Sequence, residues 1–146
     1  MISTPHAAAH PEAPARLLAM LMSADGQVHD AELDAIDAQR GFAQLGVTRE
    51  RFAELAREYE QSVGREMRSH NYLHLSDIQR LDTLMGGVRD PALRLRVCAL
   101  AARLIAADGK IGDIERMVFD HMLCRWGLTR SMVSRAILES RHAALA

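Results

Sequence analysis

Apolar residues recur at helical spacing along most of the chain. Between residues 48 and 63, for example, the apolar positions follow the i, i+3, i+4 pattern of one helix face. The same kind of pattern predicts helices over 14–24, 29–44, 76–85, 91–107, 113–125 and from 129 onward. Several of these segments end at a glycine or an Asp-Gly pair, which favours the backbone conformations that terminate helices. Because no alternating strand pattern is present, the sequence predicts an all-α fold of about seven helices.

Capping residues mark several of the predicted helix starts. Thr48 and Thr129 are suited to the N-cap position, where a side-chain oxygen accepts a hydrogen bond from a free backbone N–H. Asp90 is followed by Pro91, an N-cap residue and a proline in the first helical position. The helix that begins there is apolar on nearly all sides from 97 to 107, so we predict that it is buried at the centre of the fold.

The chain also contains an internal repeat. Residues 17–37 read LLAMLMSADGQVHDAELDAID, and residues 100–120 read LAARLIAADGKIGDIERMVFD. A second turn pattern, G-[VL]-T-R, follows in both copies. We interpret the two repeats, about 17–55 and 100–138, as the result of a duplication. Two copies are too few for a solenoid, so we predict two helical hairpins related by a pseudo-two-fold axis around the central helix.

Composition and charge narrow the class of protein. Residues 1–13 are rich in alanine, histidine and proline, so we expect a disordered tail followed by a single domain over 14–146. The 18 Lys+Arg residues nearly balance the 19 Asp+Glu residues, which argues against nucleic-acid binding. No apolar run approaches the roughly 18 residues of a membrane span. Because the N-terminus lacks a secretory pattern and the two cysteines lack a CxxC spacing, we expect a cytoplasmic protein with reduced thiols.

The repeated turn follows the pattern A-D-G-x-[VI]-x-D-x-E. It contributes four carboxylates that we single out: Asp25, Glu32, Asp108 and Glu115. The pattern matches the second half of an EF-hand loop, but in both copies a leucine occupies the position of the first calcium ligand. Paired carboxylates also serve hydrolytic catalysis, yet no nucleophile, histidine partner or phosphate-binding loop accompanies these. The sequence therefore favours neither an EF-hand nor an enzyme.

Two interpretations of the turn remain. In the structural one, Glu32 and Glu115 lie at the third position of the helices that follow, where each carboxylate reaches a free backbone N–H. In the other, the pseudo-two-fold axis brings the two turns together, and the four carboxylates share a cation that relieves their repulsion. Ligands that are all oxygen favour Ca²⁺, Mg²⁺ or Mn²⁺.

The doubled turn, the seven predicted helices and the length of 146 residues resemble the TerB family of tellurite-resistance proteins. They are also similar to the N-terminal domain of a membrane-anchored DnaJ-type co-chaperone. The resemblance covers about Ala15 to Ala144, and it implies a small all-helical domain linked to bacterial stress resistance, with a metal suspected at the acidic turns. The matching residues are Asp25, Gly26 and Glu32 in the first copy and Asp108, Gly109 and Glu115 in the second.

Two pairs of histidine and cysteine side chains are further candidates for metal ligation. His70 and His74 lie four residues apart in a segment without helical period, so we interpret them as solvated. His121 and Cys124 share one face of a predicted helix beside apolar residues, and we interpret them as partly buried side chains.

Arg96 and Arg103 lie seven residues apart and therefore share a helix face. We interpret them as a solvated or ion-paired stripe, with binding of an acidic partner as the alternative. Taken together, the sequence favours a non-enzymatic stress-response module that binds a divalent cation and a protein partner still to be identified. The alternative is a metal-free protein-interaction or scaffold domain, with a homodimer among its forms.

Overall fold

The computed structural model describes residues 10–23, 28–62, 75–108 and 113–145. All regular structure in these ranges is α-helical, which confirms the predicted all-α class. Eight helices fall within them, against about seven predicted. They are α1 (Ala13–Ser23), α2 (Asp30–Ala38), α3 (Gly41–Leu45), α4 (Arg49–Ser62), α6 (Leu75–Gly86), α7 (Pro91–Asp108), α8 (Asp113–Trp126) and α9 (Arg130–Leu145).

The predicted capping residues start their helices. Oγ1 of Thr48 accepts a hydrogen bond from the N–H of residue 51 at 3.1 Å, and Oγ1 of Thr129 accepts one from the N–H of residue 132 at 3.2 Å. Oδ1 of Asp90 accepts a hydrogen bond from the N–H of Ala92 at 3.0 Å. Each bond satisfies one of the backbone donors that a helix start leaves without an intrahelical partner. The local sequence therefore sets where α4, α7 and α9 begin.

The predicted helix over 29–44 is divided into α2 and α3. The break falls at Arg40, whose φ of 56° lies in the left-handed region. The next residue is Gly41, and a Cβ built on it would lie 2.6 Å from Cγ2 of Ile36 and 3.0 Å from Cδ2 of Leu100. At this point the chain packs so closely against Ile36 and against α7 that only glycine fits without a shift of its neighbours.

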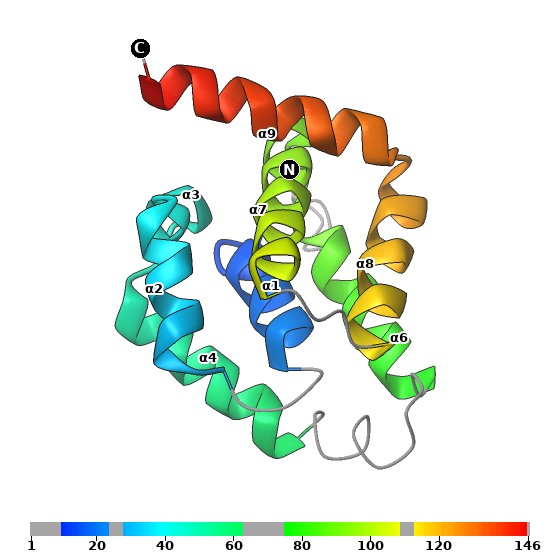
Figure 1. The fold of residues 1–146 in the computed structure, drawn as a ribbon. Coiled ribbons are helices and arrows are strands. Elements are labelled where there is room, and N and C mark those ends of the chain that lie inside the picture. Colours follow the sequence, from blue (N-terminus) through cyan, green and yellow to red (C-terminus); the bar gives the residue numbers. More distant parts are fainter. Residues whose placement is uncertain (1–9, 24–27, 63–74, 109–112, 146) are drawn as a thin grey trace, which may run out of the picture.

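Two helices occupy the centre of the fold, where the sequence indicated one. In Figure 1, α1 and α7 lie between the group α2, α3 and α4 on one side and the pair α6 and α8 on the other. Every residue of α1 except Arg16 is buried, whereas the described side chains of α7 are buried at 97–101 and 104. The first helix of each repeat thus lies at the centre of a core that the other helices complete.

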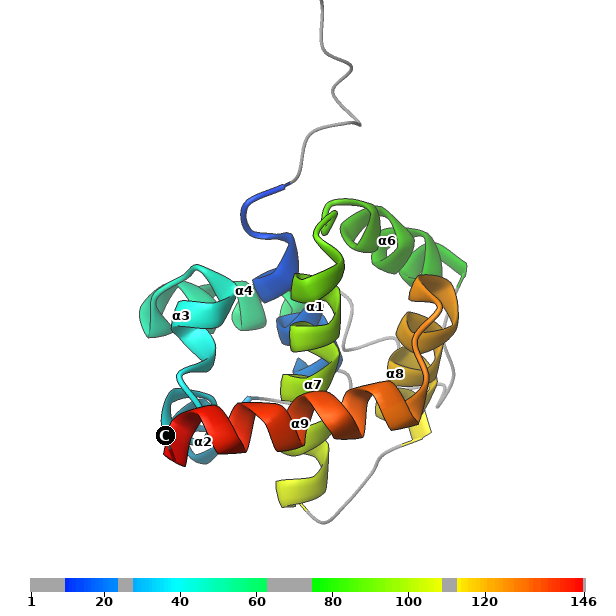
Figure 2. The same ribbon diagram turned by 90° about the horizontal axis from the view of Figure 1, so that it is seen from above.

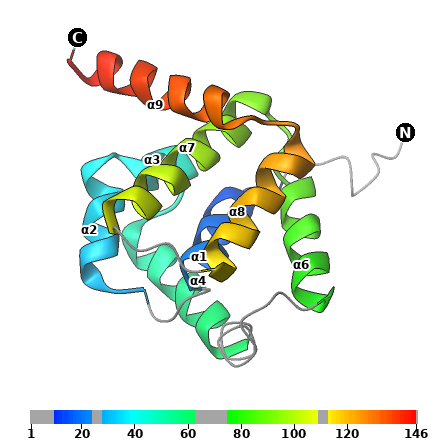
Figure 3. The ribbon, with the colours of Figure 1, turned by 45° about the vertical axis from the view of Figure 1, so that its right-hand side comes forward.

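The contacts between helices follow the internal repeat. Within each repeat the first helix packs on the last, α1 on α4 and α7 on α9. Across the repeats, α2 packs on α7, and α8 packs on α1. This reciprocal exchange is what a pseudo-two-fold arrangement of the halves produces. Viewed from above, α9 runs across α7 toward the end of α2 (Figure 2), and α8 faces the viewer in Figure 3.

The first residue that the structure describes is His10. The predicted tail over 1–13 stays a prediction for residues 1–9, which lie outside the described residues. From His10 onward the chain contacts the domain, since the N–H of His10 donates to the carbonyl oxygen of Gly87 at 3.0 Å.

Among the described helices, none has the length and apolar character needed to cross a membrane.

Candidate functional site

Glu32 and Glu115, the glutamates of the two repeated turns, line the same cavity. Each lies in the first turn of its helix, Glu32 on α2 and Glu115 on α8. The cavity has a volume of about 160 Å³ and lies among α1, α2, α7 and α8. The structure therefore places one acidic side chain from each copy of the motif at the same cavity.

The walls of this cavity are themselves repeated. Four pairs of lining residues stand 83 positions apart, the spacing of the two repeats: Leu18 and Ala101, Leu21 and Leu104, Met22 and Ile105, and Glu32 and Glu115. A space lined by equivalent residues of both halves lies on the axis that relates those halves. We call it the axial cavity. Apart from the two glutamates, its lining side chains are apolar.

The two glutamates differ in their surroundings. Oε1 of Glu32 accepts a hydrogen bond from the N–H of His29 at 3.1 Å, which is the capping contact expected at the third helical position. Glu115 is only 7% exposed, although acidic side chains are seldom buried. Glu32 therefore makes the capping contact that the structural interpretation of the turn predicts. Both glutamates also line the axial cavity, which capping alone does not require.

The other two acids of the predicted metal site are not positioned by the structure. Asp25 lies outside the described residues. Asp108 is the last residue of α7, and its side chain is outside the part that the structure describes. No group of three or more His, Cys, Asp or Glu side chains close enough to hold a metal is found among the residues that are described. The predicted cluster of four carboxylates therefore stays a prediction, with Glu32 and Glu115 as its described half.

A glutamate that the sequence did not single out secures the first turn. Oε1 of Glu60 on α4 accepts a hydrogen bond from the N–H of Val28 at 2.9 Å. Val28 directly precedes the N-cap of α2, so this bond ties the end of the turn to α4. The contact joins residues 32 positions apart, and no local pattern in the sequence could have indicated it.

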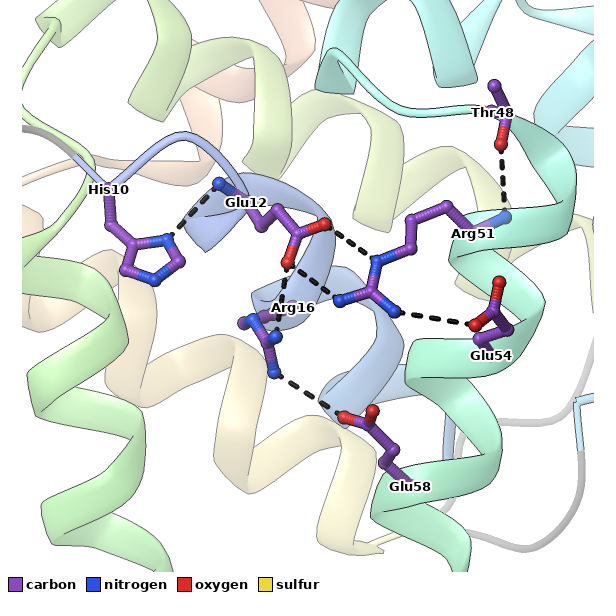
Figure 4. Close-up of polar contacts among 7 residues, drawn as sticks. All are labelled: His10, Glu12, Arg16, Thr48, Arg51, Glu54 and Glu58. Carbon is purple, nitrogen blue, oxygen red and sulfur yellow. Dashed lines mark hydrogen bonds and ion pairs between the residues drawn. The ribbon is translucent and has the colours of Figure 1, made fainter.

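A network of charges at the start of α1 was also missed (Figure 4). Glu12 pairs with Arg51 of α4 at 2.7 and 3.0 Å, and with Arg16 at 3.1 Å. Arg51 and Arg16 contact Glu54 and Glu58, each at 3.5 Å. The sequence shows the i, i+4 spacing of Glu12 and Arg16 and the i, i+3 spacing of Arg51 and Glu54, but not the contacts between α4 and the start of α1. The bond to Arg51, and that to Arg16, hold the pKa of Glu12 at about 2, below its ordinary value of 4.5.

The lowered pKa of Glu12 predicts an acid-dependent loss of stability. Its ionised form is favoured by folding, so its contribution is complete above pH 4.5 and disappears as pH falls toward 2. We expect Glu12→Gln to lower the melting temperature at pH 7 by a few degrees, since the network is partly exposed. The difference from the wild type should shrink steadily between pH 4.5 and 2. Thermal unfolding followed by circular dichroism measures it, with Glu139→Gln on exposed α9 as the control. A difference that stays constant over this range would exclude the network as its source.

The structure describes one of the two predicted pairs of possible metal ligands. Nε2 of His121 lies 2.7 Å from Oδ1 of Asp82, which joins α8 to α6. His121 is partly buried, as predicted, but Cys124 is exposed, so its predicted partial burial is wrong. Cys98 is buried, and burial raises the pKa of its thiol to about 12, so it is protonated at neutral pH. His70 and His74 lie outside the described residues.

Comparison of the chain with protein-family models, with curated proteins and with solved structures found no match.

Proposed function

We propose that this protein is a non-enzymatic, TerB-like stress-response module that binds a divalent cation at the axial cavity. The observation that carries the proposal is that Glu32 and Glu115 both line a cavity whose walls come from equivalent residues of both repeats. Two carboxylates that face one apolar space repel each other unless a proton or a cation lies between them. An ion there offsets this repulsion, and the resemblance of the doubled acidic turn to TerB proteins points the same way.

The proposed site combines two kinds of acidic side chain. Glu32 and Glu115 supply up to four oxygens from the helix starts, and Asp25 and Asp108 add oxygens from the turns before them. Ca²⁺ takes six to eight oxygen ligands and Mg²⁺ keeps several waters, so this donor set suits hard cations such as Ca²⁺, Mg²⁺ or Mn²⁺. A cavity of about 160 Å³ has room for an ion and a few water molecules.

Calorimetric titration with Ca²⁺, Mg²⁺ and Mn²⁺ tests the proposal. We expect one of the three to release or absorb heat and, at about a hundred times its dissociation constant, to raise the melting temperature by about 5–10 °C. The double variant Glu32→Gln/Glu115→Gln should lose both effects, because glutamine retains the capping contact but not the charge. Asp25→Asn/Asp108→Asn should weaken binding. Glu50→Gln/Glu139→Gln removes two exposed charges elsewhere and should bind as the wild type does.

The same variants separate the two candidate functions. Bacteria that depend on this protein should lose tellurite tolerance with Glu32→Gln/Glu115→Gln and retain it with Glu50→Gln. If no cation binds the wild type, the metal-binding proposal fails and the metal-free interaction domain takes its place.

Two large apolar side chains favour that second function: Met132 and Leu138 of α9 are 42% and 55% exposed. Burial of this surface against a second copy or another protein would give them a role.

A further inference from the structure

A larger groove lies on another face of the domain, away from the axial cavity. Its volume is about 450 Å³, within the range of small-molecule sites. One wall is α7, another is the junction of α2 and α3, and α9 lies across the top, where Figures 1 and 2 show it crossing α7. The groove shares no described lining residue with the axial cavity, so it is a separate candidate site.

The floor of the groove is an apolar stripe of α7 with an arginine on each of two turns. Leu95, Ala99 and Leu100 supply the apolar part, and Arg96 and Arg103 line the same groove. Seven residues correspond to about 10 Å along the helix axis, a distance that two long arginine side chains can span to meet one anion. The structure thus places two fixed positive charges beside an apolar surface of small-molecule size.

These two arginines have no partner among the described residues. Other arginines of the domain are paired, such as Arg51 with Glu12 and Arg130 with Asp120. For Arg96 and Arg103, no hydrogen bond or ion pair to another described side chain is found. Their guanidinium groups therefore keep their full capacity for bidentate binding of a carboxylate.

We propose that this groove binds a single-chain amphiphilic carboxylate, such as a fatty acid of medium length. The apolar chain lies on Leu95, Ala99 and Leu100 beneath α9, and the carboxylate is bound by Arg96 and Arg103. Glu139 of α9 also lines the groove, and among the described lining residues it is the acidic one. It weakens the attraction without cancelling it, because two positive charges oppose one negative charge.

Isothermal titration with decanoate, kept below its micelle concentration, tests the proposal. We expect one saturable site, and at least tenfold weaker binding of decanol, which lacks the charge, and of decyltrimethylammonium, which reverses it. Arg96→Gln/Arg103→Gln should weaken decanoate binding at least tenfold. Arg135→Gln, an exposed arginine of α9 outside the groove, is the matched control and should bind normally. Equal affinity for decanoate and decanol, or unchanged binding by the double variant, overturns the proposal.

A third variant tests the charge argument in the opposite direction. Glu139→Gln should bind decanoate more tightly than the wild type, by several-fold, because it removes the acidic side chain found among the described lining residues. This residue is exposed, so the substitution leaves the core untouched. Weaker binding by Glu139→Gln contradicts the assigned orientation of the carboxylate. The site is independent of the axial cavity, and Glu32→Gln/Glu115→Gln should bind decanoate as the wild type does.

Discussion

Replacement of Phe52 by alanine is expected to lower the free energy of unfolding by about 3–5 kcal/mol. Phe52 of α4 is fully buried, and its ring packs edge-on against Phe42 of α3, with centroids 5.6 Å apart and planes at 61°. With few aromatic residues in the chain, this pair fills space that no neighbour can fill. The substitution leaves a cavity where α3 and α4 join, and it also loses the edge-to-face contact.

Urea unfolding followed by circular dichroism measures this loss. Met132→Ala, which shortens an apolar side chain that is 42% exposed, is the matched control and should change stability by about 0.5 kcal/mol or less. A loss below about 1 kcal/mol for Phe52→Ala would mean that the site collapses around the smaller side chain and that α3 is not fixed by this pair.

The second large effect is expected at the break between α2 and α3. In Gly41→Ala the new methyl group would lie 2.6 Å from Cγ2 of Ile36 and 3.0 Å from both the carbonyl oxygen of Ile36 and Cδ2 of Leu100. One of these atoms is backbone, so the clash cannot be relieved by side-chain rotation alone. We expect a loss of about 1–3 kcal/mol, as for other overpacked core positions.

Gly86→Ala provides the comparison for Gly41→Ala. A Cβ at Gly86, the last residue of α6, would meet no atom within 4 Å. Its substitution should be neutral or slightly stabilising, because alanine restricts the unfolded chain more than glycine does. Equal effects of the two substitutions in urea unfolding would show that the approach of Gly41 to Leu100 does not constrain the fold.

The two candidate sites differ in how much of them the sequence predicted. From the repeat we predicted that Glu32 and Glu115 share a cation site, since equivalent residues of two hairpins meet when an axis relates them; the structure shows only that both line one cavity. The position of Asp25 and Asp108 was predicted in the same way, but the described residues do not test it. The groove could not be predicted as a site, because its walls come from α7, α9 and the α2–α3 junction. The sequence indicated only that Arg96 and Arg103 share a face.

By itself, the sequence determined the helices, the starts of α4, α7 and α9, and the residues that are equivalent in the two repeats. These properties depend on periodicity and on hydrogen bonds between residues a few positions apart, so they are local. Only the tertiary structure decided that α1 shares the centre with α7, that the chain turns at Arg40, and that Glu12 pairs with Arg51. Each of these depends on packing between segments that are distant in sequence. The shapes and charges of those segments must fit together in space, and no spacing of residues along the chain predicts that fit.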